Sequence, residues 1–191
     1  MRLYSRLLSV QYAQPDRALD LASHLEARQL KPAHVFLTHL HADHTAGLLS
    51  IPAQSHVYFG KRERGLLSRL LCSNHLAGRS FVHLLDMLEG KALAPFSHVI
   101  DVFGDATLWA ISTPGHTPDH LAYLINTTPN PVLVVGDAEL TTWAMQEGIL
   151  VSTTQGSRGR REVRRSASMI RAFHAEYPDA QIWFSHDEEH L

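Results

Sequence analysis

The stretch THLHADHTAG constrains this chain more than any other part of its sequence. It places three histidines and an aspartate within six consecutive positions, from His39 to His44. The preceding HVFLT is a β-rich apolar run entered after Pro32, and it predicts a buried strand. If the chain stays extended beyond that strand, His39 and His41 point to one side, because strand side chains repeat every two residues. Two imidazoles then face the same point in space.

Asp43 and His44 come next in the chain, at the turn out of this strand. The following TAGLLS predicts the opening of a helix, with Asp43 near its positive N-terminus. The result is four candidate ligands on one strand-to-helix turn. Imidazole nitrogens together with a carboxylate are the donors that zinc, iron and manganese accept. The turn therefore predicts part of a metal site.

Three further candidate ligands follow other predicted strands. ATLWAIS alternates like a strand and leads into TPGHTPDH, which carries His116. PVLVV is a short apolar strand followed by Gly136 and Asp137, and AQIWF is another, followed by His186. Open α/β proteins place their sites at the C-terminal ends of strands. We therefore expect these side chains to meet the histidines of the first turn.

Composition sets the frame for this site. A chain of 191 residues with 45% apolar and 19% charged residues predicts one globular domain over residues 1–191. Its formal net charge of −2 gives no overall attraction to nucleic acid or to acidic membranes, so neither is expected as a partner. No stretch approaches the roughly 18 apolar residues of a membrane span. The single cysteine, Cys72, makes no internal disulfide, so a cytoplasmic location is expected.

The pattern as a whole resembles a known family. HxHxDH, a histidine in TPGHT, an aspartate after an apolar strand and a histidine near the C-terminus resemble the metallo-β-lactamase fold superfamily. The resemblance extends from about Lys31 to His190. It implies an α/β fold, namely a four-layer αββα sandwich in which two sheets pack face to face with helices outside.

The resemblance also implies that seven side chains divide between two divalent metal ions, most typically zinc, with iron or manganese as alternatives. The implied ligands are, for the first ion, His39, His41 and His116; for the second ion, Asp43, His44 and His186; and, as the bridge between them, Asp137. A carboxylate at the bridging position, together with His44, resembles the dinuclear hydrolases and differs from the antibiotic-hydrolysing enzymes.

This ligand set implies a hydrolase acting on a small molecule. Two cations that share a water lower its pKa from 15.7 towards about 7, so hydroxide is present at neutral pH. The hydroxide would attack a lactone, ester or thioester, while Asp43 holds it and then carries its proton to the leaving group.

The implied substrate differs between branches of the superfamily. The sequence around the motifs resembles the N-acyl-homoserine lactonases, which have glycine where this chain has Ser185 and tyrosine where it has Leu140. THLHADHTAG equally resembles glyoxalase II and the persulfide dioxygenases, and it is similar to the tRNA 3′-processing phosphodiesterases. A catalytically impaired metal-binding relative is the alternative outside the enzymes. Retention of all seven ligand types favours the enzyme.

The segment before the motif is short. Superfamily members carry two or more strands there, whereas 38 residues precede His39 in this chain. YSRLLSVQYA predicts one strand and PDRALDLASHLEARQL predicts the first helix. The first sheet is therefore expected to be shortened. An uncovered sheet edge favours pairing with a second subunit, so a homodimer or a truncated gene product is hypothesised.

Two other stretches have competing interpretations. Residues 64–90 predict two short leucine-rich helices with a break near Gly78, within a helical insertion at 62–98 that forms a lid or covers the core. SRGRREVRR, residues 157–165, holds five arginines that suit phosphate or nucleic acid. Because Val163, Ala167 and Ile170 follow at helical spacing, the favoured interpretation turns the arginines outward on an amphipathic helix.

Overall fold

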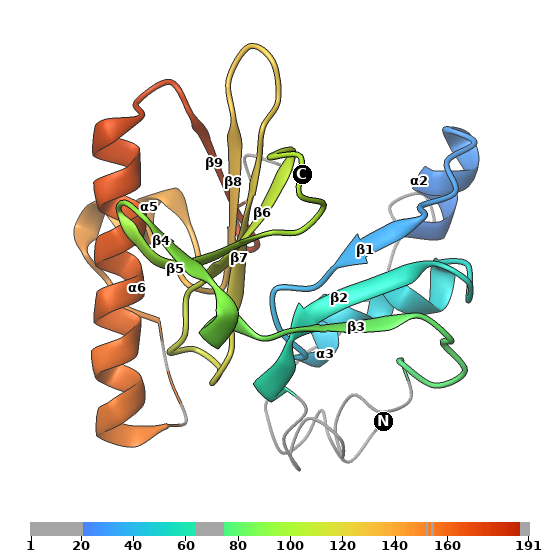
Figure 1. Cartoon of the computed structure of the whole chain (residues 1–191), viewed down its shortest axis with the longest axis horizontal. Helices are drawn as coiled ribbons and strands as arrows, with labels where there is room; N and C mark the ends of the chain where they lie inside the picture. Colours follow the sequence, from blue (N-terminus) through green and yellow to red (C-terminus); the bar gives the residue numbers. More distant parts are fainter. Residues whose placement is uncertain (1–20, 64–74, 152, 154, 188–191) are drawn as a thin grey trace.

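The fold is seen in a computed structural model that describes residues 21–63, 75–151, 153 and 155–187 (Figure 1). The α-helices are α2 (Leu21–Ala27), α3 (Ala42–Thr45), α5 (Thr142–Glu147) and α6 (Gly156–Glu176). The 3₁₀ helices are η2 (Ala46–Ser50), η3 (Lys61–Glu63) and η4 (Met87–Glu89). The strands are β1 (His34–Phe36), β2 (His56–Gly60), β3 (Val82–Leu85), β4 (Lys91–Leu93), β5 (Phe96–Asp101), β6 (Leu108–Ser112), β7 (Leu121–Ile125), β8 (Val132–Gly136) and β9 (Gln181–Phe184).

These strands form two sheets. The first has the order β1-β2-β3, and all of its neighbours are parallel. The second has the order β4-β5-β6-β7-β8-β9. Its neighbours are antiparallel from β4 to β8, and β9 then adds parallel to β8. Because β8 and β9 run in the same direction, the residues that follow them emerge at the same edge of the sheet.

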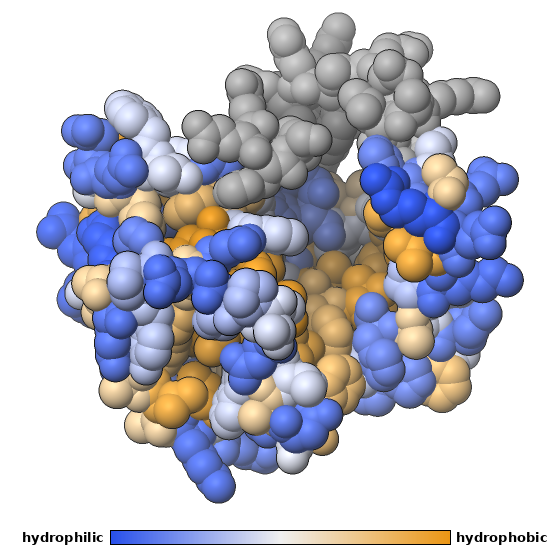
Figure 2. Space-filling model, turned by 90° about the horizontal axis from the view of Figure 1, so that it is seen from above, coloured by the Kyte–Doolittle hydropathy of each residue, from blue (hydrophilic) through white to orange (hydrophobic). Residues whose placement is uncertain are grey.

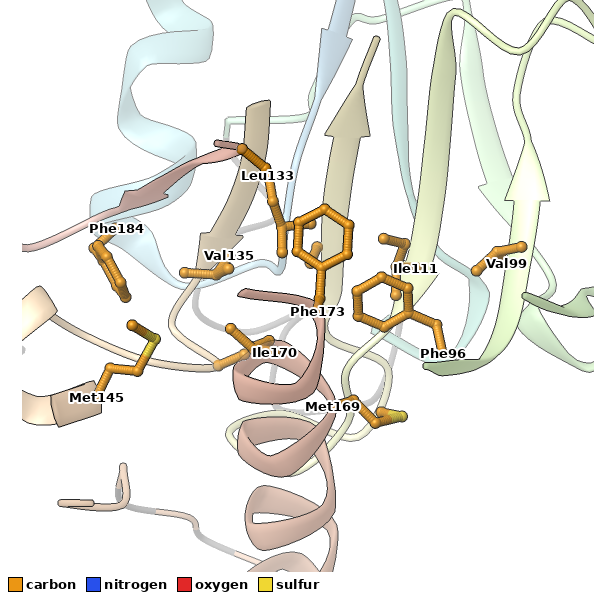
Figure 3. Close-up of a cluster of buried hydrophobic side chains, with 13 residues drawn as sticks. Phe96, Val99, Ile111, Leu133, Val135, Met145, Met169, Ile170, Phe173 and Phe184 are labelled. Carbon is orange, nitrogen blue, oxygen red and sulfur yellow. The ribbon is translucent and has the colours of Figure 1, made fainter. Parts of the chain in front are cut away.

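Alternation along the strands builds three apolar layers. On β6, Leu108 and Ala110 face the first sheet, where they pack in a cluster with Phe36 of β1. Their neighbour Ile111 points the other way, into the cluster beneath α6 (Figure 3). A third cluster packs β2 against η2, with Leu48 beside Phe59. The sheets therefore face each other with helices outside, which confirms the expected αββα arrangement (Figure 1).

The long helix α6 follows from its apolar spacing. Its buried face includes Val163, Ala167, Ile170 and Phe173, which recur every three or four residues. Ile170 and Phe173 pack in the core cluster of the six-stranded sheet. The five arginines of SRGRREVRR, in the first part of this helix, are exposed, as its amphipathic pattern indicates. In Figure 2, hydrophobic side chains lie in the central hollow of the molecule, and most side chains on its outer sides are hydrophilic.

The prediction of two helices over residues 64–90 was wrong for its second half. Residues 64–74 lie outside the described residues, but Val82–Leu85 form strand β3 and Met87–Glu89 form a 3₁₀ helix. Strand β3 pairs along its whole length with β2. This pairing supplies backbone hydrogen bonds that outweigh the helical spacing of the leucines. The insertion at 62–98 is therefore not a helical lid in its described part, because it contains β3, β4 and the first half of β5, which belong to the sheets.

The first sheet has three strands in the part of the chain that the structure describes. The strand predicted from YSRLLSVQYA lies outside the described residues, and the first predicted helix is seen from Leu21 onwards as α2. The homodimer hypothesised from the exposed sheet edge stays a prediction. Among the described helices, none is long and apolar enough to cross a membrane.

Candidate metal centre

The loop after β1 carries four of the candidate ligands. The backbone N–H of Leu121 donates to the carbonyl of Thr38 at 2.8 Å, which ties the loop to β7 of the facing sheet. His39 is fully buried, and its Nε2 lies 2.9 Å from Nδ1 of His41. The predicted convergence of these two imidazoles is present. Helix α3 begins at Ala42, earlier than the predicted helix, and it carries Asp43 and His44.

His116 reaches the same point from the loop that follows β6. Its Nε2 lies 3.0 Å from Nδ1 of His41. Gly115 has φ +138°, and a Cβ there would collide with the backbone of Val163 in α6. The hydroxyl of Ser166, also on α6, donates to the carbonyl of Pro114 at 2.8 Å. The glycine thus lets the loop lie directly on the helix, and this contact sets the position of His116.

Asp137 and His186 come from the ends of β8 and β9, which lie side by side. Gly136 has φ +55°, and a Cβ there would lie 2.8 Å from Thr38 and 2.9 Å from His120 Nε2. A larger residue would therefore push Asp137 away from the first ligand loop. The backbone N–H of His186 donates to the carbonyl of Leu140, three residues after Asp137, at 3.3 Å.

The two carboxylate oxygens of Asp137 face different histidines. Oδ2 lies 3.3 Å from His116 Nε2 and 4.0 Å from His39 Nε2. Oδ1 lies 3.2 Å from the Nε2 atoms of both His44 and His186. Asp137 is 4% exposed, and its buried Oδ1 accepts no well-aligned hydrogen bond among the described residues. Such an oxygen surrounded by imidazole nitrogens fits a cation.

All seven predicted ligands therefore lie together. Their donor atoms form two groups, within each of which every atom lies within 4.8 Å of the others. The groups are His39, His41, His116 and Asp137, and Asp43, His44 and His186. In the second group the side chains of Asp43 and His186 are 57% and 43% exposed, whereas His39 is fully buried. Solvent thus reaches the centre at the second group and at His41, which is also exposed.

The electrostatics of the centre favour the neutral form of two ligand imidazoles, His39 and His41. Burial, reinforced by the neighbouring imidazoles, lowers the pKa of His39 far below its usual range and also lowers that of His41. Burial alone would raise the pKa of Asp137, but His44, His116 and His186 outweigh it and lower it to about 2. Neutral imidazoles beside an ionised carboxylate are the protonation states that bind metal ions.

Sequence reasoning assigned no role to His120, which the structure places beneath the centre. His120 is fully buried, and its Nε2 accepts a hydrogen bond from the backbone N–H of Asp137 at 3.1 Å. Its Nδ1 lies 2.9 Å from the hydroxyl of Thr113. Burial, followed by the proximity of His116, lowers the pKa of His120 to about 3. The neutral ring thus anchors the backbone of Asp137. Its place directly before β7 was the available signal.

Glu63 is the second residue that the sequence did not reveal. It is 2% exposed, and its Oε1 accepts from the backbone N–H of Asp119 at 3.0 Å. Its Oε2 accepts from the backbone N–H of Leu40 at 3.4 Å. One carboxylate therefore joins the loop that carries His39 and His41 to the loop that carries His116. No local sequence pattern signals such a contact, because its partners are 23 and 56 residues away.

Known proteins with similar sequences include hydrolases of two kinds. No protein-family model matches the chain. The N-acyl homoserine lactonase AttM of Agrobacterium fabrum is 28% identical to it, covering 91% of this chain and 66% of the relative. A hydroxyacylglutathione hydrolase of Shewanella baltica is 34% identical over 117 residues, covering 58% of this chain and 36% of the relative. The chain thus spans just under two thirds of the lactonase.

Solved structures of hydrolases have a similar fold. An N-acyl homoserine lactone hydrolase with N-hexanoyl-L-homoserine at its catalytic metal centre superposes with a TM-score of 0.69, at 17% identity. The match covers 91% of this chain and 64% of that hydrolase. The hydrolase AbOPH of the beta-lactamase superfamily matches 87% of this chain and 62% of its own, with a TM-score of 0.55 and 18% identity. The chain has the metallo-β-lactamase fold. In the metallo-β-lactamase fold of this chain, the seven predicted ligands lie at the ends of β1, β6, β8 and β9.

Proposed function

We propose that this chain is a metal-dependent hydrolase that cleaves the acyl bond of a small-molecule lactone, ester or thioester. The observation that carries the proposal is the division of Asp137 between the two groups, with Oδ2 towards His116 and Oδ1 towards His44 and His186. A carboxylate held in this way suits a bridge between two divalent cations. Lactonase and hydroxyacylglutathione hydrolase relatives support the same reaction class.

The proposed ligands follow the two groups. His39, His41 and His116 would hold one cation and Asp43, His44 and His186 the other, with Asp137 shared. Zinc is the expected metal, and iron or manganese would accept the same donors. When bound, the cations would lower the pKa of a shared water and polarise the scissile carbonyl.

Asp43 is the proposed proton carrier. Its carboxylate lies 3.6 Å from His44 Nε2, and its side chain is 57% exposed to solvent. It can therefore accept the proton of the attacking water and release it to the leaving oxygen or sulfur. In this scheme the buried His39 and His120 keep the ligand loops in place and take no part in proton transfer.

Leu140 favours a thioester among the three substrate classes. The side chain of Leu140 has no polar atom. It therefore donates no hydrogen bond to a leaving oxygen. A thiolate, whose conjugate thiol has a pKa of about 8.5, departs without such a donor more easily than an alkoxide.

The test is metal content together with a substrate panel. Purified protein should hold about two metal ions per chain by elemental analysis, and His116→Ala and Asp137→Ala should lower this number. The metal-loaded protein should hydrolyse a thioester faster than a lactone, a simple ester or a phosphodiester. One ion or none after reconstitution with zinc, iron or manganese would contradict the proposal. Faster cleavage of the phosphodiester would reassign the enzyme to the phosphodiesterase branch.

A further inference from the structure

A second pocket lies beside the loop that carries His116. It has a volume of about 150 Å³, and it gathers residues from α6, from η3 and η4, and from strands β5 and β6. We call it the arginine pocket. Its lining includes Arg62, Ser97, His98, Ser112, Arg158 and Arg165. Four cationic or imidazole side chains and two hydroxyls thus converge from separate elements on a space large enough for a small anion.

Helical geometry explains why only some arginines of α6 reach this pocket. Arg158, Glu162, Arg165 and Met169 recur at intervals of four, three and four residues, so they form one stripe along the helix. Met169 is buried at the lower end of this stripe, and its sulfur lies 3.9 Å from the hydroxyl of Ser97. The stripe therefore runs along the groove beside β5. The other arginines of SRGRREVRR do not line the pocket.

The charges in the pocket are only partly neutralised. Arg62 donates through Nε and Nη2 to Asp119 Oδ1, at 3.1 and 2.9 Å. Arg158 donates through Nε to Glu162 at 3.1 Å, so its two terminal nitrogens remain available. Arg165 has no ion pair with any described residue. Three guanidinium groups thus face two carboxylates, Glu162 and Asp119, which leaves one positive charge in excess. Such an excess of fixed positive charge favours an anion, because bringing these groups together otherwise costs electrostatic repulsion.

The loop between β6 and β7 lines the arginine pocket and also carries the candidate ligand His116. Pro114 lines the pocket and lies two residues before His116. Arg62 also lines it, and its backbone N–H donates to Asp119 Oδ2 at 2.8 Å at the far end of the same loop. An elongated ligand with its anionic end beside Pro114 would therefore run along this loop towards the centre.

We propose that the arginine pocket binds a phosphate group carried by the substrate, so that the substrate is a phosphorylated acyl thioester. This inference rests on the proposed hydrolase function. Guanidinium groups form paired, charge-assisted hydrogen bonds with phosphate oxygens, and the two serine hydroxyls can donate to the remaining oxygens. Binding energy from this remote group would hold the acyl bond at the metal centre.

The first experiment measures phosphate binding and does not depend on catalysis. Adenosine 3′,5′-bisphosphate is titrated into the metal-loaded protein by isothermal calorimetry. The double variant Arg158→Ala/Arg165→Ala is compared with Arg160→Ala/Arg164→Ala, which removes the same charge from the same helix outside the pocket. We expect about tenfold weaker binding in the pocket variant and no change in the control, since each lost charge-assisted bond matters only where the phosphate sits. Equal weakening in both variants, or no binding to the unaltered protein, would overturn the proposal.

The second experiment asks whether the phosphate belongs to the substrate. Butyryl-coenzyme A and butyryl-N-acetylcysteamine carry the same thioester bond with and without phosphates. The pocket variant should raise KM about tenfold for the coenzyme A ester, with kcat unchanged, and leave the short thioester unaffected. If phosphate binds but neither KM changes, the pocket takes free phosphate only and the proposal is wrong. If the unaltered protein hydrolyses neither ester, the proposed thioesterase function fails, and the calorimetry still decides whether the pocket binds phosphate.

Discussion

The metal centre and the arginine pocket lie on either side of the same loop, yet they are built in opposite ways. The centre consists of short side chains on α3 and on loops fixed by hydrogen bonds, with His39 and His120 fully buried. The pocket consists of long arginines that are largely exposed, such as Arg158 at 72%. Catalysis needs atoms held within tenths of an ångström, whereas recognition of a phosphate needs mainly charge at the correct place. The comparison predicts large effects of substitutions at the centre and small ones at the pocket.

The largest effect is expected from Asp137→Ala. Removing the shared carboxylate should lower hydrolysis by more than about 100-fold, as expected when a group that stabilises the developing charge is lost. Elemental analysis should show fewer metal ions per chain. Asp179→Asn, at an exposed carboxylate at the opposite end of β9 from His186, should change neither quantity. Full activity and full metal content in Asp137→Ala would refute the division of Asp137 between two cations.

Glu63→Ala should cause the next largest effect, on stability. It removes the carboxylate that accepts from the buried N–H groups of Leu40 and Asp119, at a cost of about 1–3 kcal/mol for each hydrogen bond. Denaturant unfolding of the metal-free protein measures this loss directly. Glu89→Ala, at an exposed carboxylate on η4, is the control and should unfold as the unaltered chain does. If both variants unfold alike, Glu63 does not brace the ligand loops.

The metal-free protein should lose stability as the pH falls below about 6.5. The pKa values of His39, His41 and His120 are lowered by burial, so these rings stay neutral in the folded state where the unfolded chain binds protons. Protons therefore favour the unfolded state, by about 1.4 kcal/mol per pH unit for each such ring. Asp137 raises the pKa of His44 in spite of burial, so His44 offsets the loss of stability caused by one of these three rings.

The midpoint of urea unfolding, measured between pH 7 and pH 5, tests this sign. A midpoint that rises towards pH 5 would show that the buried imidazoles are charged in the folded protein. Added zinc should reduce the fall near neutral pH, because a bound cation stabilises the folded state.

The smallest effect is expected from Arg165→Ala. This side chain is exposed, so the unfolding midpoint and the metal content should equal those of the unaltered protein. Only the affinity for a phosphorylated ligand should change. A clear loss of stability would mean that Arg165 has a structural role and would remove the contrast between the two regions.

Much of this molecule was predictable because its signals are local. Each candidate ligand follows an apolar run, and the strands β1, β6, β8 and β9 are present where those runs predicted them. The apolar spacing in α6 likewise defined its buried face. A residue's position after a strand depends on its neighbours in sequence, so the sequence determined which side chains gather at one edge of the sheets.

Tertiary structure decided what local spacing does not record. Leu84 and Leu85 stand at helical spacing to Leu88, yet pairing with β2 made residues 82–85 a strand. Glu63 and His120 matter only because they accept hydrogen bonds from backbone N–H groups of distant loops. Arg158 and Arg165 differ from the other arginines of α6 only in the face of the helix that meets β5. The sequence thus determined which donor atoms form the site. Only the fold, through contacts between distant segments, decided which residues hold those donor atoms in place and which arginines line the pocket beside them.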